Sequence, residues 1–152
     1  MFRPNASLTA QTTEDQCQKL LDQLNGTEAV GDLAAKMGIE FADLTYDHVS
    51  GTAPVEGNTQ PMGLFHGGGH VVLAESLASM HSFLIAGGKN VVGVDLNATH
   101  LRAAREGTVT GRAEVLHQGR TIVSHEVKMT DDAGRLLSIV RITNMILKTE
   151  PK

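Results

Sequence analysis

Apolar and polar residues near the start of the chain follow a helical rhythm. From Glu14 to Leu24 the apolar residues recur every three or four positions, which predicts an amphipathic helix. Thr27 is placed to cap a second helix that reaches Met37. These segments predict a helical N-terminal extension over residues 1–37.

The middle of the chain holds a much longer apolar segment. Short strand-like segments at residues 39–41 and 44–53 are followed by a loop that contains Pro61. A helix is then expected from about Gly68 to Ile85, apolar on nearly every side. A helix of this composition is expected to be buried, with a sheet on most of its sides.

The rest of the chain alternates between apolar and polar positions with a period of two, which is typical of strands. Turn sequences between these segments, with no helix among the last three, indicate an antiparallel meander. The predicted class is α+β, a curved antiparallel sheet wrapped around one long central helix. Residues 38–148 would form this core within a single domain spanning 1–152. The four predicted strands lie at 92–98, 109–115, 121–129 and 136–147.

Composition then removes several classes of function. The net charge is −4, with no Trp and no basic run, so nucleic acid is not an expected partner. The chain has no apolar run long enough to span a membrane and no secretory signal pattern at its start, which predicts a cytoplasmic protein without a membrane partner. Cys17 is the single cysteine, which excludes an internal disulfide. Residues 77–152 carry ten Lys and Arg against seven acidic residues, so a small phosphorylated ligand stays open.

Three polar residues interrupt the apolar helix on one narrow stripe. Glu75, Ser79 and Ser82 stand at i, i+4 and i+7. A buried, unpaired carboxylate costs several kcal/mol or shifts its pKa upward. Glu75 is therefore either paired with an arginine, held in a hydrogen-bond network, or open to a cleft where it acts on a ligand.

The start of the same helix favours the last alternative. Glycines 67–69 let a ligand approach the backbone, and the first N–H groups of a helix have no partner inside it. Such N–H groups can polarise a carbonyl, and Gln60 and His66 add side-chain donors nearby. A carboxylate two turns further along could then activate water or attack the carbonyl itself. His66 and His70 share helical spacing, but a structural zinc needs four ligands, so no metal is expected.

The run from Asn58 to Gly68 (NTQPMGLFHGG), continuing through residues 72–76 (VLAES), resembles the signature of hot-dog-fold thioesterases. It is most similar to the branch that acts on 4-hydroxybenzoyl-CoA, 1,4-dihydroxy-2-naphthoyl-CoA and phenylacetate-pathway thioesters. Residues 92–102, 106–107 and 116–120 also resemble that branch, so the similarity covers roughly residues 38–147. It implies hydrolysis of an aryl- or medium-chain acyl-CoA, with no cofactor beyond the CoA of the substrate.

The resemblance also implies roles for individual residues. Glu75 would be the nucleophile or the general base, and the Gly67 N–H would polarise the thioester carbonyl. Gln60 and His66 would assist, and Ser79 would position the attacking water or the leaving thiolate.

The same resemblance implies an assembly and a second binding region. The active site would form across a homodimer, with Glu75 of one subunit facing the Gln60 and Gly67 segment of the other, and the dimers would pair into a homotetramer. His100, Arg102 and Arg120 would contact the CoA portion. The alternative from another class is a non-catalytic acyl-CoA-binding hot-dog module, and a third is a hot-dog dehydratase, which calls for a different His and acid arrangement.

Overall fold

The computed structural model describes residues 7–25 and 30–148. Two N-terminal helices, α1 (Glu14–Asn25) and α2 (Gly31–Lys36), confirm the predicted helical extension. Thr27, the expected cap of the second helix, lies outside the described residues. Among the helices of the described ranges, none is long and apolar enough to cross a membrane.

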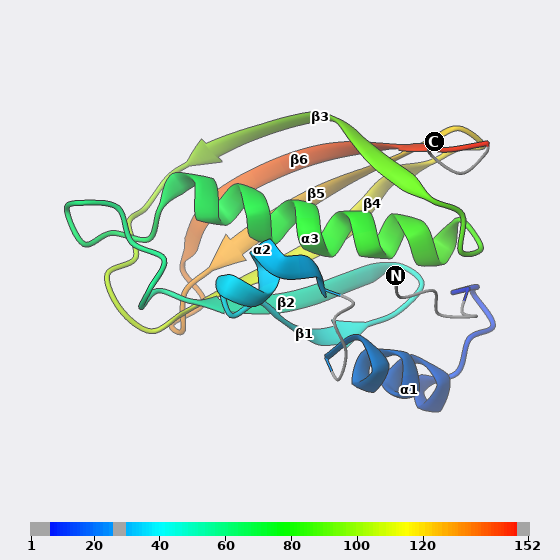
Figure 1. The fold of residues 1–152 in the computed structure, drawn as a ribbon, viewed down its shortest axis with the longest axis horizontal. Coiled ribbons are helices and arrows are strands. Elements are labelled where there is room, and N and C mark those ends of the chain that lie inside the picture. The colour runs from blue at the N-terminus through cyan, green and yellow to red at the C-terminus, as the bar shows by residue number, and fades with distance from the viewer. Residues whose placement is uncertain (1–6, 26–29, 149–152) are drawn as a thin grey trace.

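A six-stranded antiparallel sheet curves around the long helix α3 (Gly67–Ile85), as Figure 1 shows. The order of strands across the sheet is β1-β2-β4-β5-β6-β3, so β1 and β3 form its two edges. This confirms the α+β class and the sheet wrapped around one helix. The strands are β1 (Glu40–Leu44), β2 (His48–Pro54), β3 (Val91–His100), β4 (Thr108–Gln118), β5 (Ile122–Thr130) and β6 (Leu136–Ile146).

The boundary between the first two strands differs from the prediction. Leu44 was expected to begin a strand that runs to Ala53, but it ends β1, and a tight turn separates it from β2. The Thr45 hydroxyl accepts the N–H groups of Asp47 and His48 at 3.3 and 3.2 Å. This side-chain turn gives the backbone an alternative to a continuous strand, which the apolar pattern alone does not reveal.

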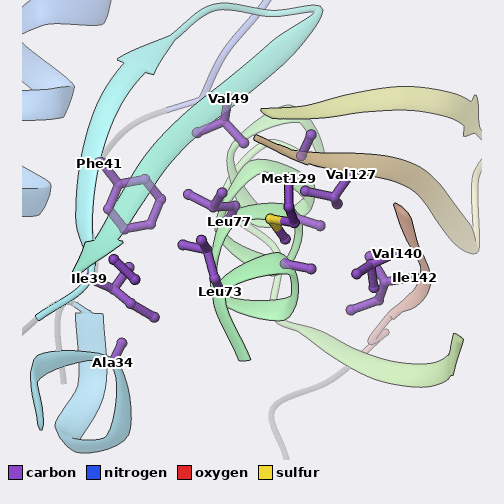
Figure 2. Close-up of a cluster of buried hydrophobic side chains, with 14 of the residues drawn as sticks. Ala34, Ile39, Phe41, Val49, Leu73, Leu77, Val127, Met129, Val140 and Ile142 are labelled. Carbon is purple, nitrogen blue, oxygen red and sulfur yellow. The ribbon is translucent and has the colours of Figure 1, made fainter. Parts of the chain in front are cut away.

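Helix α3 has two apolar faces with different surroundings. Leu73 and Leu77 are fully buried against the sheet, where they meet Val49 and Met129 (Figure 2). The opposite face is not covered by the sheet and instead lines a cleft between α2, α3 and the start of β3. The expectation of a sheet on most sides is therefore only partly right. The helix is apolar nearly all round because one face serves the core and the other serves the cleft.

The two edge strands of the sheet differ in what contacts their outer side. Along β1, the Asn25 side chain donates to the Phe41 carbonyl at 2.6 Å and accepts the Phe41 N–H at 2.9 Å, so it occupies the place of a further strand. Along β3, ten residues pair only with β6, and Val92 and Val94 are 40% and 51% exposed. An edge of this length and apolarity is suited to pairing with another strand.

A buried histidine pair joins α3 to the sheet. His81 Nε2 donates to the Thr45 carbonyl at 2.9 Å, so its Nδ1 accepts from His125 Nε2 at 2.8 Å. Burial lowers the pKa of His81 to about 4 and that of His125 to about 3. Both rings are therefore neutral at pH 7, and a proton added to either would be a buried charge.

This pair predicts a loss of stability in mild acid. Unfolded histidine has a pKa near 6.5, so below that pH the unfolded chain binds more protons than the folded one. Stability is fully present above about pH 6.5 and falls toward pH 4, by up to about 1.4 kcal/mol per histidine per pH unit. Urea unfolding at pH 7 and pH 5 should show this decrease.

The matched variant is His125→Gln, whose amide can still donate to His81 but does not titrate. It should show a smaller difference between pH 7 and pH 5 than the native protein. His117→Gln, a substitution of an exposed histidine, should leave the difference unchanged. Equal pH dependence in all three proteins would contradict this account.

Candidate active site

The N-terminus of α3 presents one backbone donor without a partner. His66 is the N-cap, and its Nδ1 accepts the Gly68 N–H at 2.8 Å. The His66 carbonyl accepts the Gly69 N–H at 2.8 Å. Within the described residues, no group accepts the N–H of Gly67. The positive end of the helix dipole and a bare N–H therefore coincide at Gly67.

The loop before α3 brings Gln60 and His66 into one segment. The Asn58 carbonyl accepts the His66 N–H at 2.9 Å, and the Leu64 carbonyl accepts the Gln60 N–H at 2.8 Å. The Gln60 side-chain oxygen accepts the Met62 N–H, so the amide NH₂ of Gln60 is the part of this side chain that can donate. Since His66 Nδ1 is an acceptor, its Nε2 carries the ring proton. Both side chains thus present N–H groups near the start of the helix.

His100 also belongs to this end of α3. A Cβ built on Gly67 would lie 2.9 Å from His100 Nε2, so only glycine leaves room for the imidazole there. The Ser138 hydroxyl donates to the Thr99 carbonyl at 3.1 Å and accepts from His100 Nδ1 at 2.9 Å. His100 was predicted to contact CoA; the structure places it against the backbone of the helix start.

His70 packs behind His100. Its ring lies 5.2 Å from the His100 ring and 4.8 Å from the Phe65 ring, centroid to centroid. Burial lowers the pKa of His70 to about 4, with a further contribution from His100, so this imidazole is neutral at pH 7. His70 faces the interior and not His66, so the two do not form a shared ligand pair.

Glu75 opens onto the cleft. The side chain is exposed, and a Cβ on Gly93 of β3 would lie 2.8 Å from its Oε1. The cleft has a volume of about 560 Å³ and is mainly apolar. Of the three alternatives for Glu75, the structure supports the open cleft. The apolar residues around it include Val30, Leu33, Phe41, Val72, Met80, Phe83 and Val91.

Ser79 lies in the same cleft, one turn after Glu75. Its hydroxyl oxygen accepts the Asn144 side-chain N–H at 2.9 Å. Asn144 comes from β6, is fully buried, and was not singled out from the sequence. The available signal was its register, because it continues the inward-facing series of Val140 and Ile142 as a polar residue.

Comparison with known proteins shows which family the chain belongs to. The sequence profile of the thioesterase superfamily matches residues 62–138. The chain is 40% identical over 119 residues to the 1,4-dihydroxy-2-naphthoyl-CoA hydrolase of Escherichia coli, a match that covers 77% of this chain and 88% of that protein. The chain belongs to the thioesterase superfamily.

Two further relatives of this thioesterase agree with that assignment. The chain is 39% identical over 129 residues to the proofreading thioesterase EntH of Cronobacter turicensis, a match that covers 84% of this chain and 93% of that protein. The crystal structure of a mutant form of the Pseudomonas aeruginosa thioesterase PA1618 matches with a TM-score of 0.81 and 35% identity, over 93% of this chain and 99% of that chain. These similarities confirm the resemblance and the hot-dog fold.

Within a single chain of this thioesterase, the candidate groups fall into two sets. Glu75 lies eight residues after Gly67 on the same helix, a separation of about 12 Å along the axis. Gly67 contacts His100 at one end of β3, and Glu75 contacts Gly93 near the other. The carboxylate and the free N–H therefore do not face one carbonyl in the same chain.

The predicted CoA-binding residues are divided in the same way. Arg102 follows the end of β3 and donates to the Leu136 carbonyl at 3.2 Å, at the start of β6. Arg120 lies beside Ile146, at the end of β6, and lines a hollow with Lys89 and Lys148. The two arginines therefore lie at opposite ends of β6.

Proposed function

We propose that this thioesterase hydrolyses the thioester of an apolar acyl-CoA, with an aryl or medium-chain acyl group, at a site shared by two subunits. The observation that carries the proposal is the position of Glu75, an exposed carboxylate at the wall of a large apolar cleft. The acyl group would occupy the cleft beside Val72, Met80 and Phe83, where it is removed from water.

The chemistry divides between donors and a base. The Gly67 N–H, aided by Gln60 and His66, holds the carbonyl oxygen and stabilises the negative charge that develops on it. Glu75 accepts a proton from water as the water oxygen bonds to the carbonyl carbon; attack by the carboxylate itself is the alternative first step. The C–S bond then breaks, and the CoA sulfur leaves with a proton as the free thiol. Ser79 supplies a hydroxyl for the water or the thiolate.

The edge strand β3 supports the two-subunit site. If two β3 strands pair antiparallel about a two-fold axis near Leu96 and Asn97, Gly93 of one chain comes opposite His100 of the partner subunit. Since Gly93 marks the position of Glu75 and His100 marks that of Gly67, this pairing brings the carboxylate to the free N–H of the other chain. The pairing also covers the exposed valines of β3. The proposed active unit is a homodimer, and a tetramer would add a second interface.

The same pairing unites the basic residues proposed to hold CoA. It brings the end of the sheet that carries Arg120 next to His100 and Arg102 of the partner subunit. Lys89, Arg120 and Lys148 surround one hollow, and no carboxylate of the described residues forms an ion pair with them. Free cations of this kind suit the phosphates of the CoA nucleotide.

Arg120→Ala should raise the KM for an acyl-CoA several-fold and leave kcat nearly unchanged. Phosphate binding is equal in the ground and transition states, so its loss does not slow the chemical step. The informative comparison uses the same acyl group as an N-acetylcysteamine thioester, which lacks the nucleotide. The variant and the native protein should have equal kinetics on that truncated substrate, and a lowered kcat on either substrate would contradict the assignment.

The proposed function is tested by thiol release from benzoyl-, phenylacetyl-, naphthoyl- and fatty acyl-CoA thioesters of increasing length. Turnover that depends on Glu75 with at least one substrate is expected. Tight binding of these thioesters without release of CoA would identify a non-catalytic acyl-CoA-binding module instead.

A further inference from the structure

We propose that Asn144, held by Ser82, is a positioning residue that makes Ser79 a hydrogen-bond donor toward the cleft. The inference rests on the proposed function and adds two residues from behind the cleft to its machinery. Two serines on the same face of α3, Ser76 and Ser79, differ in their hydrogen bonds.

Ser76 and Ser79 both line the cleft, but only the hydroxyl proton of Ser76 has an acceptor among the described residues. The Ser76 hydroxyl donates to the Val72 carbonyl at 2.8 Å, the usual local partner of a serine in a helix. The Ser79 oxygen instead accepts the Asn144 N–H at 2.9 Å, and among the described residues nothing accepts its proton. A hydroxyl that accepts from behind keeps its own O–H free to donate in front.

The orientation of the Asn144 amide is set by Ser82. The Ser82 hydroxyl donates to Asn144 Oδ1 at 3.1 Å, which directs the NH₂ group of Asn144 toward Ser79. Both Asn144 and Ser82 are fully buried, so water does not compete for these bonds. Ser82, Asn144 and Ser79 thus form one hydrogen-bonded chain that runs from the core to the cleft.

The position of Asn144 in the sheet places this chain beside the carboxylate. Asn144 is the cross-strand neighbour of Gly93, and the Glu75 oxygen lies against Gly93. Glu75 and Ser79 stand one turn apart on the helix and face the same cleft. A Ser79 hydroxyl fixed as a donor can hold the attacking water that Glu75 deprotonates, or receive the departing thiolate.

Asn144→Asp tests this directly, because the carboxylate is nearly the same shape but can only accept. It would draw the Ser79 proton away from the cleft, so kcat should fall about tenfold to a hundredfold with KM changed less than about threefold. The same substitution in a Ser79→Ala background should cause no further loss, because the group that it orients is gone.

Two further variants complete the experiment. Thr143→Ala, on the other face of the same strand, should leave kcat unchanged. If the buried aspartate prevents folding, Asn144→Ala removes the donor without adding charge and enters the same double-mutant cycle. An unchanged kcat, or equal losses with and without Ser79, would overturn the inference. The proposed function would survive that result as long as thiol release still required Glu75.

Discussion

Glu75→Gln is expected to reduce kcat for thioester hydrolysis about a thousandfold, within the range that general-base and nucleophilic groups contribute. The amide keeps the size of the side chain but cannot take a proton from water or attack a carbonyl. Because Glu75 is exposed and forms no ion pair with the described residues, its replacement should leave the unfolding midpoint nearly unchanged. The measurement is steady-state thiol release alongside thermal unfolding.

Glu40→Gln provides the matched control, since it neutralises another exposed carboxylate, on β1, that does not line the cleft. Its kinetics should equal those of the native protein. If Glu75→Gln retained more than about a tenth of the native kcat, the carboxylate would be neither base nor nucleophile, and the mechanism would have to rest on the donors at the start of α3.

Mixing two inactive variants should restore activity. Glu75→Ala and Gln60→Ala each damage every site in their own homodimers. When equal amounts are unfolded and refolded together, random pairing gives about a quarter of the sites an intact Glu75 from one chain and an intact Gln60 from the other. The mixture should therefore reach about a quarter of the native rate.

A site contained in one chain predicts the opposite outcome, because no combination of these two chains would then hold both intact residues. The refolded mixture would stay as inactive as its components. Refolding each variant alone is the necessary control, and refolded native protein sets the reference rate. A tetramer built from such dimers should also reach about a quarter of the native rate.

The periodicity of apolar residues in the sequence was sufficient to predict the architecture. Alternating residues in the last four segments and the apolar helix from Gly68 to Ile85 predicted elements within a few residues of those observed. The turn at Thr45 escaped because it is built by a hydroxyl group inside a segment that otherwise resembles a strand. A cleft at Glu75 was expected, but its extent along α3 could not be predicted, since an apolar helix face has the same pattern whether it meets a sheet or a ligand.

The proximity of candidate residues could be predicted only where they lie close together along the chain. Gln60, His66 and Gly67 belong to one short run, so their proximity followed from the sequence. Asn144 and Gly93 pair across the sheet and contact Ser79 and Glu75 where α3 packs on it, and no local pattern encodes such contacts. The separation of Arg102 from Arg120 likewise depends on the direction of β6 and could not be read from the spacing of the two arginines.

The asymmetry of the two sheet edges has a consequence for how far the protein can polymerise. Two open edges on every molecule would allow each sheet to extend end to end into a fibre. Asn25 occupies the backbone groups of Phe41 and closes the β1 edge, so growth through the sheet is available only at β3. In the proposed dimer, pairing of two such edges uses up both, so the sheet itself cannot extend beyond two chains. One amide side chain at the end of α1 therefore occupies backbone groups of β1 that a further strand would need.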